Sequence, residues 1–170
     1  VQDVDKHNAT YGSVAAHPEL IQADDEGRGV PAFWNHMNSI DYNPAFDQIM
    51  LSVRGNSEIW IIDHSTTTAE AAGHTGGKRG KGGDLLYRWG NPATYDTGTR
   101  DSQTFYQQHD AEWVAPGYPG AGNITVFNNG LGRNYSTIDE FTPPVDANGN
   151  YAIVAGQPFG PKTFAWTYKA

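Results

Sequence analysis

Two histidines and one arginine are the residues of this chain whose types and spacing could support group-transfer chemistry. His36 and His109 stand 73 positions apart, and Arg54 lies between them. A neutral imidazole can act as a nucleophile or a general base near neutral pH. A guanidinium offers a planar fork that binds an oxyanion such as sulfate, phosphate or carboxylate. Together these residue types suggest transfer of a group from an anionic donor through a covalent histidine intermediate.

The same histidines have two other interpretations. A histidine at the start of a strand is commonly a hydrogen-bonded structural residue. A histidine-rich channel could also bind a metal ion, but no carboxylate or second histidine has close metal-ligand spacing around His36 or His109. The chain has no cysteine, which excludes disulfides and thiolate metal sites. Because P-loop, G-x-S-x-G and H-E-x-x-H motifs are also absent, we expect neither a metal nor another cofactor.

Each histidine is expected to open the first strand of a four-strand unit. Runs of β-branched and aromatic residues bounded by Asn, Pro, Gly and Ser predict these strands. They are predicted at residues 36–42, 48–54, 58–63 and 84–89, and again at 109–114, 123–128, 135–141 and 163–168. A further short strand is predicted at residues 151–154, and a loop at 65–83. Because antiparallel pairing joins the start of one strand to the end of the next, His36 and Arg54 are expected at one edge of the sheet.

The repeated order of strands predicts a β-propeller. Four-strand units of about 40 or more residues are typical of propeller blades. We therefore expect an all-β portion of a propeller, with about two four-stranded antiparallel blades and long loops. Residues 1–32 are predicted to form a loop-rich connecting segment, 33–92 a blade, and 93–170 a blade with an insertion. Two blades cannot close a propeller, which needs about four to eight, so further blades of the same protein or of other chains are expected to complete it.

Composition narrows the choice of partners. The net charge of -8 and the pI of about 5.0 argue against nucleic acid, whose phosphates favour a basic surface. No apolar run approaches the roughly eighteen residues of a membrane span. The basic cluster of Lys78, Arg79 and Lys81 is either a solvated loop or a flexible lid that steers an anionic substrate. Ser13 could cap one or two helical turns within residues 13–21.

Five stretches together resemble the bacterial arylsulfotransferase family of the PAPS-independent type. They are WNHMNSIDYNP, LSVRGNSEIWIIDHST, GGDLLYRWGNP, QHDAEWV and ITVFNNG, and they span about residues 33–130. The resemblance implies a six-bladed propeller that moves a sulfuryl group from an aryl sulfate to a phenolic acceptor without a nucleotide donor. It also implies a periplasmic or extracellular location.

The resemblance also suggests a role for each site residue. His109, in the Q-H-D motif, matches the histidine that is transiently sulfurylated. His36 of the H-x-N-S motif and Arg54 of the S-x-R motif would hold the sulfate oxygens. When the two units are overlaid, Arg54 falls opposite Asn128 or Asn129, and Asn128 is expected to bind substrate beside His36 and Arg54.

The family carries one more active-site histidine, upstream of the H-x-N-S motif. His7 and His17 lack the matching context, so we expect that residue before Val1, in a longer molecule of which this chain is a fragment. An alternative function is a non-catalytic extracellular propeller that serves as a binding or structural module. A third is a hydrolase in which water replaces the phenol.

Overall fold

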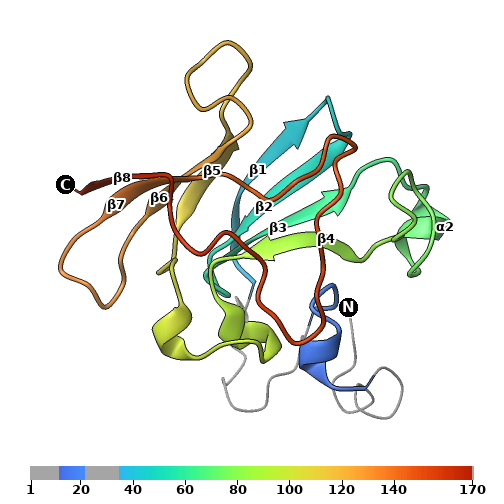
Figure 1. Cartoon of the computed structure of the whole chain (residues 1–170), viewed down its shortest axis with the longest axis horizontal. Helices are drawn as coiled ribbons and strands as arrows, with labels where there is room; N and C mark the ends of the chain where they lie inside the picture. Colours follow the sequence, from blue (N-terminus) through green and yellow to red (C-terminus); the bar gives the residue numbers. More distant parts are fainter. Residues whose placement is uncertain (1–11, 22–34, 170) are drawn as a thin grey trace.

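The chain folds into two four-stranded antiparallel sheets. The computed structural model describes residues 12–21 and 35–169. The strand orders are β1-β2-β3-β4 and β5-β6-β7-β8 (Figure 1). Helix in this part of the chain is limited to the one-turn α2 and three short 3-10 turns, none of them long and apolar enough to cross a membrane. The predicted fold class is therefore confirmed: the chain is all-β, and its two sheets are blades of a propeller that they do not close.

The first blade follows the predicted pattern closely. Its strands are β1 (Met37–Asn43), β2 (Gln48–Val53), β3 (Glu58–Asp63) and β4 (Leu85–Trp89). β1 turns into β2 because the side-chain oxygen of Asn43 accepts the amides of Ala45 and Phe46, at 3.0 and 3.3 Å. β1 begins one residue later than predicted because His36 has a φ of 34°, in the left-handed region that strand residues avoid.

The second blade repeats this order with a shorter last strand. Its strands are β5 (His109–Trp113), β6 (Ile124–Asn128), β7 (Thr137–Phe141) and β8 (Trp166–Lys169). β8 pairs only with β7, and their last pair is Glu140 with Trp166. The chain reaches Pro143 just after β7, and proline cannot continue a hydrogen-bonded ladder. For this reason β8 begins three residues later than predicted.

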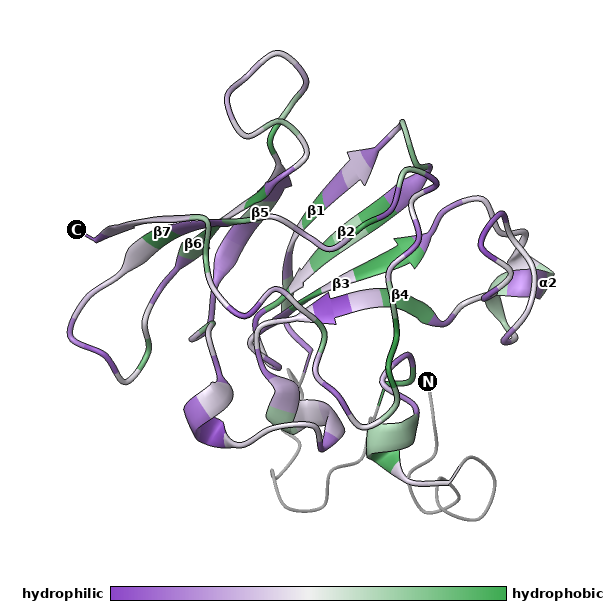
Figure 2. Cartoon of the chain, viewed as in Figure 1, coloured by the Kyte–Doolittle hydropathy of each residue, from purple (hydrophilic) through white to green (hydrophobic). Residues whose placement is uncertain are grey.

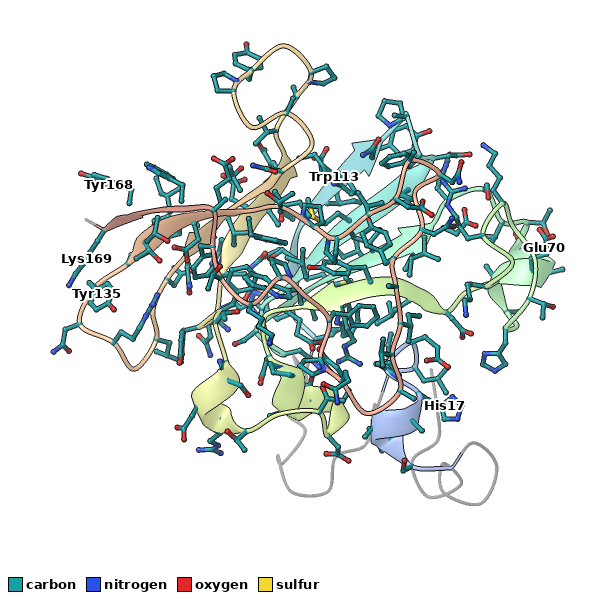
Figure 3. The ribbon with its side chains drawn as sticks, in the orientation of Figure 1. His17, Glu70, Trp113, Tyr135, Tyr168 and Lys169 are labelled. Atoms are coloured by element: carbon teal, nitrogen blue, oxygen red, sulfur yellow. The ribbon has the colours of Figure 1, made fainter. Side chains whose placement is uncertain are left out.

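Three local predictions need correction. Residues 151–154 do not form a strand, because only the single bridge between Val145 and Tyr151 forms there. Residues 65–83 are not all loop, because α2 (Thr68–Ala71) forms one turn whose capping box pairs Thr67 with Glu70 (Figure 3). Within the described residues 12–21, the one helical element is the 3-10 turn η1 (Val14–Ala16). Ser13 occupies its cap position without a side-chain capping bond. Residues 1–11 and 22–32 of the predicted segment, including His7, lie outside the described residues.

One hydrophobic core lies between the two blades. Figure 2 shows apolar residues along β2, β3, β4 and β6. The Trp89 ring of the first blade stacks on Phe141 of the second, with centroids 4.1 Å apart, and Phe105 meets Trp89 edge-on at 4.9 Å. The buried members from both blades are Met50, Ile59, Ile61, Leu86, Tyr87, Trp89, Ala111, Ile124, Val126 and Phe141. Because the core crosses the interface, each blade depends on the other to bury its apolar face.

The basic loop does not form a lid over the predicted site. The Lys78 ammonium lies 2.7 Å from the Asp47 carboxylate, and Arg79 Nη2 donates to the Phe46 carbonyl at 2.7 Å. Both partners belong to the β1–β2 turn, at the opposite end of these strands from the predicted site. The hydrogen bond from Lys78 also lowers the pKa of the Asp47 carboxyl. The interpretation of Lys78 and Arg79 as a substrate lid is therefore wrong.

Candidate active site

The three predicted catalytic residues lie at one end of three neighbouring strands, β1, β2 and β5. His36 immediately precedes β1, Arg54 immediately follows β2, and His109 is the first residue of β5. The Arg54 amide donates to the His36 carbonyl at 3.2 Å, so these two strand ends meet as antiparallel pairing requires. β1 and β5 are the inner strands of their blades and pack side by side.

The Arg54 side chain connects the two blades. Its Nη2 donates a hydrogen bond to Oε1 of Gln107, which stands two residues before His109. The guanidinium of the first blade therefore lies within one side-chain contact of the segment that presents His109. Sequence reasoning missed Gln107, although its place next to the Q-H-D motif could have pointed to it.

The segment before His109 is anchored deep in the first blade. The Gln107 amide donates to Ser57 Oγ at 3.2 Å. Gln108 is fully buried, and its Nε2 donates to Ser52 Oγ at 3.2 Å and to the Glu58 carbonyl at 2.7 Å. Since Ser52 lies on β2 and Glu58 opens β3, the first blade fixes the position of the histidine on the second blade.

Side chains of β1 also satisfy the exposed edge of β5. Asn38 donates to the Gln108 carbonyl at 2.8 Å. Ser39 Oγ accepts the Ala111 amide at 2.9 Å, and Asp41 accepts the Trp113 amide at 2.8 Å. These contacts replace the missing strand partner on the inner side of β5 and keep the two inner strands in register. The polar residues of the N-S-I-D stretch therefore connect β1 to the segment that carries His109.

The backbone is unusual at three positions around the site. His36, Gln107 and Asp110 have φ angles of 34°, 58° and 56°, although none of them is glycine. The pairing register shifts between Met37 and Ser39 in β1 and just after His109 in β5, as in a β-bulge. Each left-handed non-glycine residue costs on the order of 1–3 kcal/mol, and such residues concentrate at functional sites.

The ring of His109 has a fixed orientation and lies beside a cleft. Its Nδ1 lies 2.5 Å from Oδ1 of Asn129, the residue that follows β6. His109 is half-buried and lines a cleft of about 310 Å³ together with Phe127 and Ile138, which pair across β6 and β7. One nitrogen of the imidazole is therefore bound to Asn129, and the ring borders the cleft beside the sheet.

Asn128 occupies a different environment from the one predicted for it. Its side chain is fully buried. Its Oδ1 accepts the Tyr106 amide at 2.9 Å, and its Nδ2 donates to the Thr104 carbonyl and to Asp139 Oδ2, both at 2.9 Å. This placement favours a positioning role over the direct substrate contact that the sequence suggested.

A buried ion pair supports the base of the site. The Arg88 guanidinium forms two hydrogen bonds to the Glu58 carboxylate, at 2.6 and 3.1 Å, and both side chains are at most 1% exposed. Trp60 Nε1 and Thr94 Oγ1 each donate to the same carboxylate at 2.6 Å. Because the Glu58 carbonyl accepts from Gln108, this network stiffens the strand on which the His109 segment rests.

Two sequence predictions about the site remain, one on His17 and one on metal binding. His17, one of the two histidines without a family context, bonds Glu19 at 2.9 Å, and the Glu19 carbonyl accepts the amide of Leu85, the first residue of β4. Among residues 12–21 and 35–169, no group of three or more His, Asp or Glu side chains could hold a metal ion. The predicted site residues carry imidazole, guanidinium and amide groups, which bind oxyanions, and the carboxyl side chains of Asp110 and Glu112 also line the cleft beside His109.

Comparison with known proteins agrees with the motifs. No match was found among curated proteins or among solved structures. The family model for Arylsulfotransferase (ASST) matches residues 9–153, which include His36, Arg54 and His109. The chain therefore belongs to the arylsulfotransferase family, a family of transferase enzymes.

Proposed function

We propose that this chain carries the sulfuryl-transfer site of an aryl sulfate sulfotransferase. His109 is the nucleophile, and His36 and Arg54 bind the sulfate oxygens. The observation that carries this proposal is the link between the blades: Arg54 bonds the His36 carbonyl through its backbone and Gln107, next to the His109 segment, through its guanidinium.

The reaction has two steps in this proposal. The lone pair of the neutral His109 ring forms a bond to sulfur in line with the aryl oxygen, while the aryl O–S bond breaks and phenolate leaves. A phenolic acceptor then attacks the sulfur of sulfo-His109 and loses its proton to solvent, while the N–S bond breaks and its electrons return to the neutral histidine. Arg54 and His36 stabilise the charge on the sulfate oxygens during both steps, and no cofactor takes part.

Further blades complete the propeller in this proposal. The outer face of the second blade carries a cross-strand row in which His109 pairs with Phe127, Phe127 with Ile138, and Ile138 with Tyr168. The three apolar members are 40%, 42% and 54% exposed. A neighbouring blade of the same protein or of another chain would pack against the apolar members of this row, and the propeller would work in the periplasm or outside the cell.

Replacement of His109 tests the proposed function. We expect His109→Asn in the complete protein, with all its blades, to abolish transfer from p-nitrophenyl sulfate to phenol, because the amide cannot form the covalent intermediate. Intact-protein mass spectrometry after a rapid quench should find a sulfurylated wild-type protein and no adduct on the variant. His64→Asn is the matched control, because His64 is exposed and contacts Asp47 at the opposite end of the blade.

The outcomes separate the alternative functions. Near wild-type turnover by His109→Asn would show that the covalent role is wrong. An adduct whose sulfate is released to water equally fast with and without phenol would indicate a hydrolase. Absence of both turnover and adduct in the wild-type protein would favour a non-catalytic module.

A further inference from the structure

Asn129 fixes the ring of His109 through a single short contact. Its amide oxygen lies 2.5 Å from His109 Nδ1. An amide oxygen only accepts hydrogen bonds, so the ring nitrogen that faces it must carry the hydrogen. In the neutral imidazole the other nitrogen, Nε2, then holds the lone pair.

The backbone at Asn129 is anchored by two sets of hydrogen bonds. On one side is Asn128, whose fully buried side chain makes three hydrogen bonds with Tyr106, Thr104 and Asp139. On the other side, Ser136 Oγ donates to the Asn129 carbonyl at 3.0 Å. The backbone that carries Asn129 is therefore anchored, and its exposed side chain makes the contact with His109.

The loop that follows Asn129 is anchored by aromatic contacts. The Arg133 guanidinium lies 4.9 Å from the ring centroids of both Tyr106 and Tyr135. The Lys169 ammonium lies 3.8 Å from the Tyr135 ring at the outer end of the second blade (Figure 3). Contacts between a cation and an aromatic face stabilise such a loop, which begins directly after Asn129.

We propose that Asn129 is a positioning residue that keeps His109 in the Nδ1–H tautomer and makes Nε2 the atom that accepts the sulfuryl group. The inference rests on the sulfo-histidine function proposed above. The Nε2 lone pair forms the N–S bond, and the electrons of the aryl O–S bond leave with the phenolate. The Nδ1–H stays bonded to Asn129 Oδ1, which stabilises the positive charge that the sulfurylated ring acquires. When the acceptor oxygen attacks sulfur, the N–S electrons return to Nε2.

The tautomer can be measured directly without any substrate. Two-bond ¹⁵N–¹H correlation spectra of the uniformly labelled protein, recorded at about pH 8.5 where an ordinary histidine is neutral, distinguish Nδ1–H from Nε2–H. The spectrum of His109→Asn identifies the His109 signals. We expect Nδ1–H for wild-type His109 and a shift toward Nε2–H, the form preferred by free histidine, in Asn129→Ala. Asn129→Asp keeps an acceptor oxygen and should retain Nδ1–H.

Kinetics provide the second readout. We expect Asn129→Ala to lower kcat/KM for p-nitrophenyl sulfate by about tenfold to a hundredfold, the usual effect of removing a group that orients a histidine. Asn129→Asp should move the acidic limb of the pH–rate profile to higher pH, because a carboxylate stabilises the protonated ring. Asn134→Ala is the control, since Asn134 is exposed in the same loop.

Each outcome decides a separate question. An Nε2–H signal in the wild-type protein, or an unchanged tautomer in Asn129→Ala, would overturn the inference even if transfer occurs. The predicted tautomers in a protein that transfers no sulfuryl group would overturn the proposed function and leave the tautomer assignment standing. Adduct formation at Nδ1 instead of Nε2 would also overturn the inference.

Discussion

At the scale of single residues, the site depends on amides that orient the charged and nucleophilic groups. Gln107 accepts a hydrogen bond from Arg54, and Asn129 contacts His109. The left-handed backbone at Gln107 and Asp110, on either side of the Gln108–His109 pair, turns these side chains in directions that a regular strand does not allow. A supporting group of this kind keeps a reactive geometry fixed at little cost during the reaction.

The fork of Arg54 is the first feature to test at this scale. Arg54→Lys should lower the transfer rate by about 10²–10³-fold, the usual loss when one preorganised donor to a developing oxyanion is removed. The lysine ammonium is a compact point charge without the planar fork of arginine, so it cannot bind Gln107 and two sulfate oxygens at once. Initial rates with p-nitrophenyl sulfate and phenol measure the effect.

Arg79→Lys makes the same substitution at the opposite end of the blade, where Arg79 bonds the Phe46 carbonyl. We expect no more than a small change in rate. An unchanged rate in Arg54→Lys would mean that Arg54 does not bind the sulfate.

At the scale of elements, β3 is the platform on which the His109 segment rests. Ser57, just before β3, and Glu58, its first residue, both accept hydrogen bonds from that segment. The Glu58 carboxylate is in turn bound by Arg88 of β4. Strands β3 and β4 therefore support the site through the backbone of Glu58. Removal of the cation would leave a buried carboxylate without its countercharge.

Arg88→Met should therefore lower the free energy of unfolding by about 3–5 kcal/mol, which urea denaturation measures. The double variant Glu58→Gln/Arg88→Met should regain part of this loss, because no charge is then buried. Arg100→Met, at an exposed position, should change little. A loss below about 1 kcal/mol in Arg88→Met, as expected for an exposed pair, would contradict the role of the buried network.

At the scale of the whole molecule, the two blades behave as one unit because they share a core. Trp89 and Phe141 stack across the interface, and the inner strands are joined by the side chains of Asn38, Ser39 and Asp41. Neither blade can bury its apolar face after the other has unfolded. A shared core also means that damage to the second blade moves His109 relative to Arg54.

The shared core predicts a single unfolding transition. Tryptophan fluorescence and far-UV circular dichroism should report the same urea midpoint. Phe141→Ala should lower the free energy of unfolding by about 3–5 kcal/mol and shift both signals together. Phe127→Ala, on the exposed face, should cost far less, since Phe127 is 40% exposed. Two separate transitions would show that the blades are independent.

Local signals explain why most strands could be predicted. β3 runs from Glu58 to Asp63 as predicted, because its apolar run is bounded by turn residues on both sides. The start of β8 could not be predicted in this way, since a strand extends only as far as its partner, and β7 ends before Pro143. The same limit applies to residues 151–154, which had strand-like composition but formed only one bridge.

The sequence by itself determined the all-β class, the repeat of two four-strand units and the family, because these depend on residue order and short-range pattern. It also singled out His36, Arg54 and His109, whose roles stay a prediction. Only the tertiary structure revealed the partners of these residues: Gln107 for Arg54, Asn129 for His109, and the buried surroundings that remove Asn128 from easy contact with substrate. The physical reason is distance along the chain. Arg54 and Gln107 are 53 positions apart, and a hydrogen bond across that separation forms only after both blades have packed on one core.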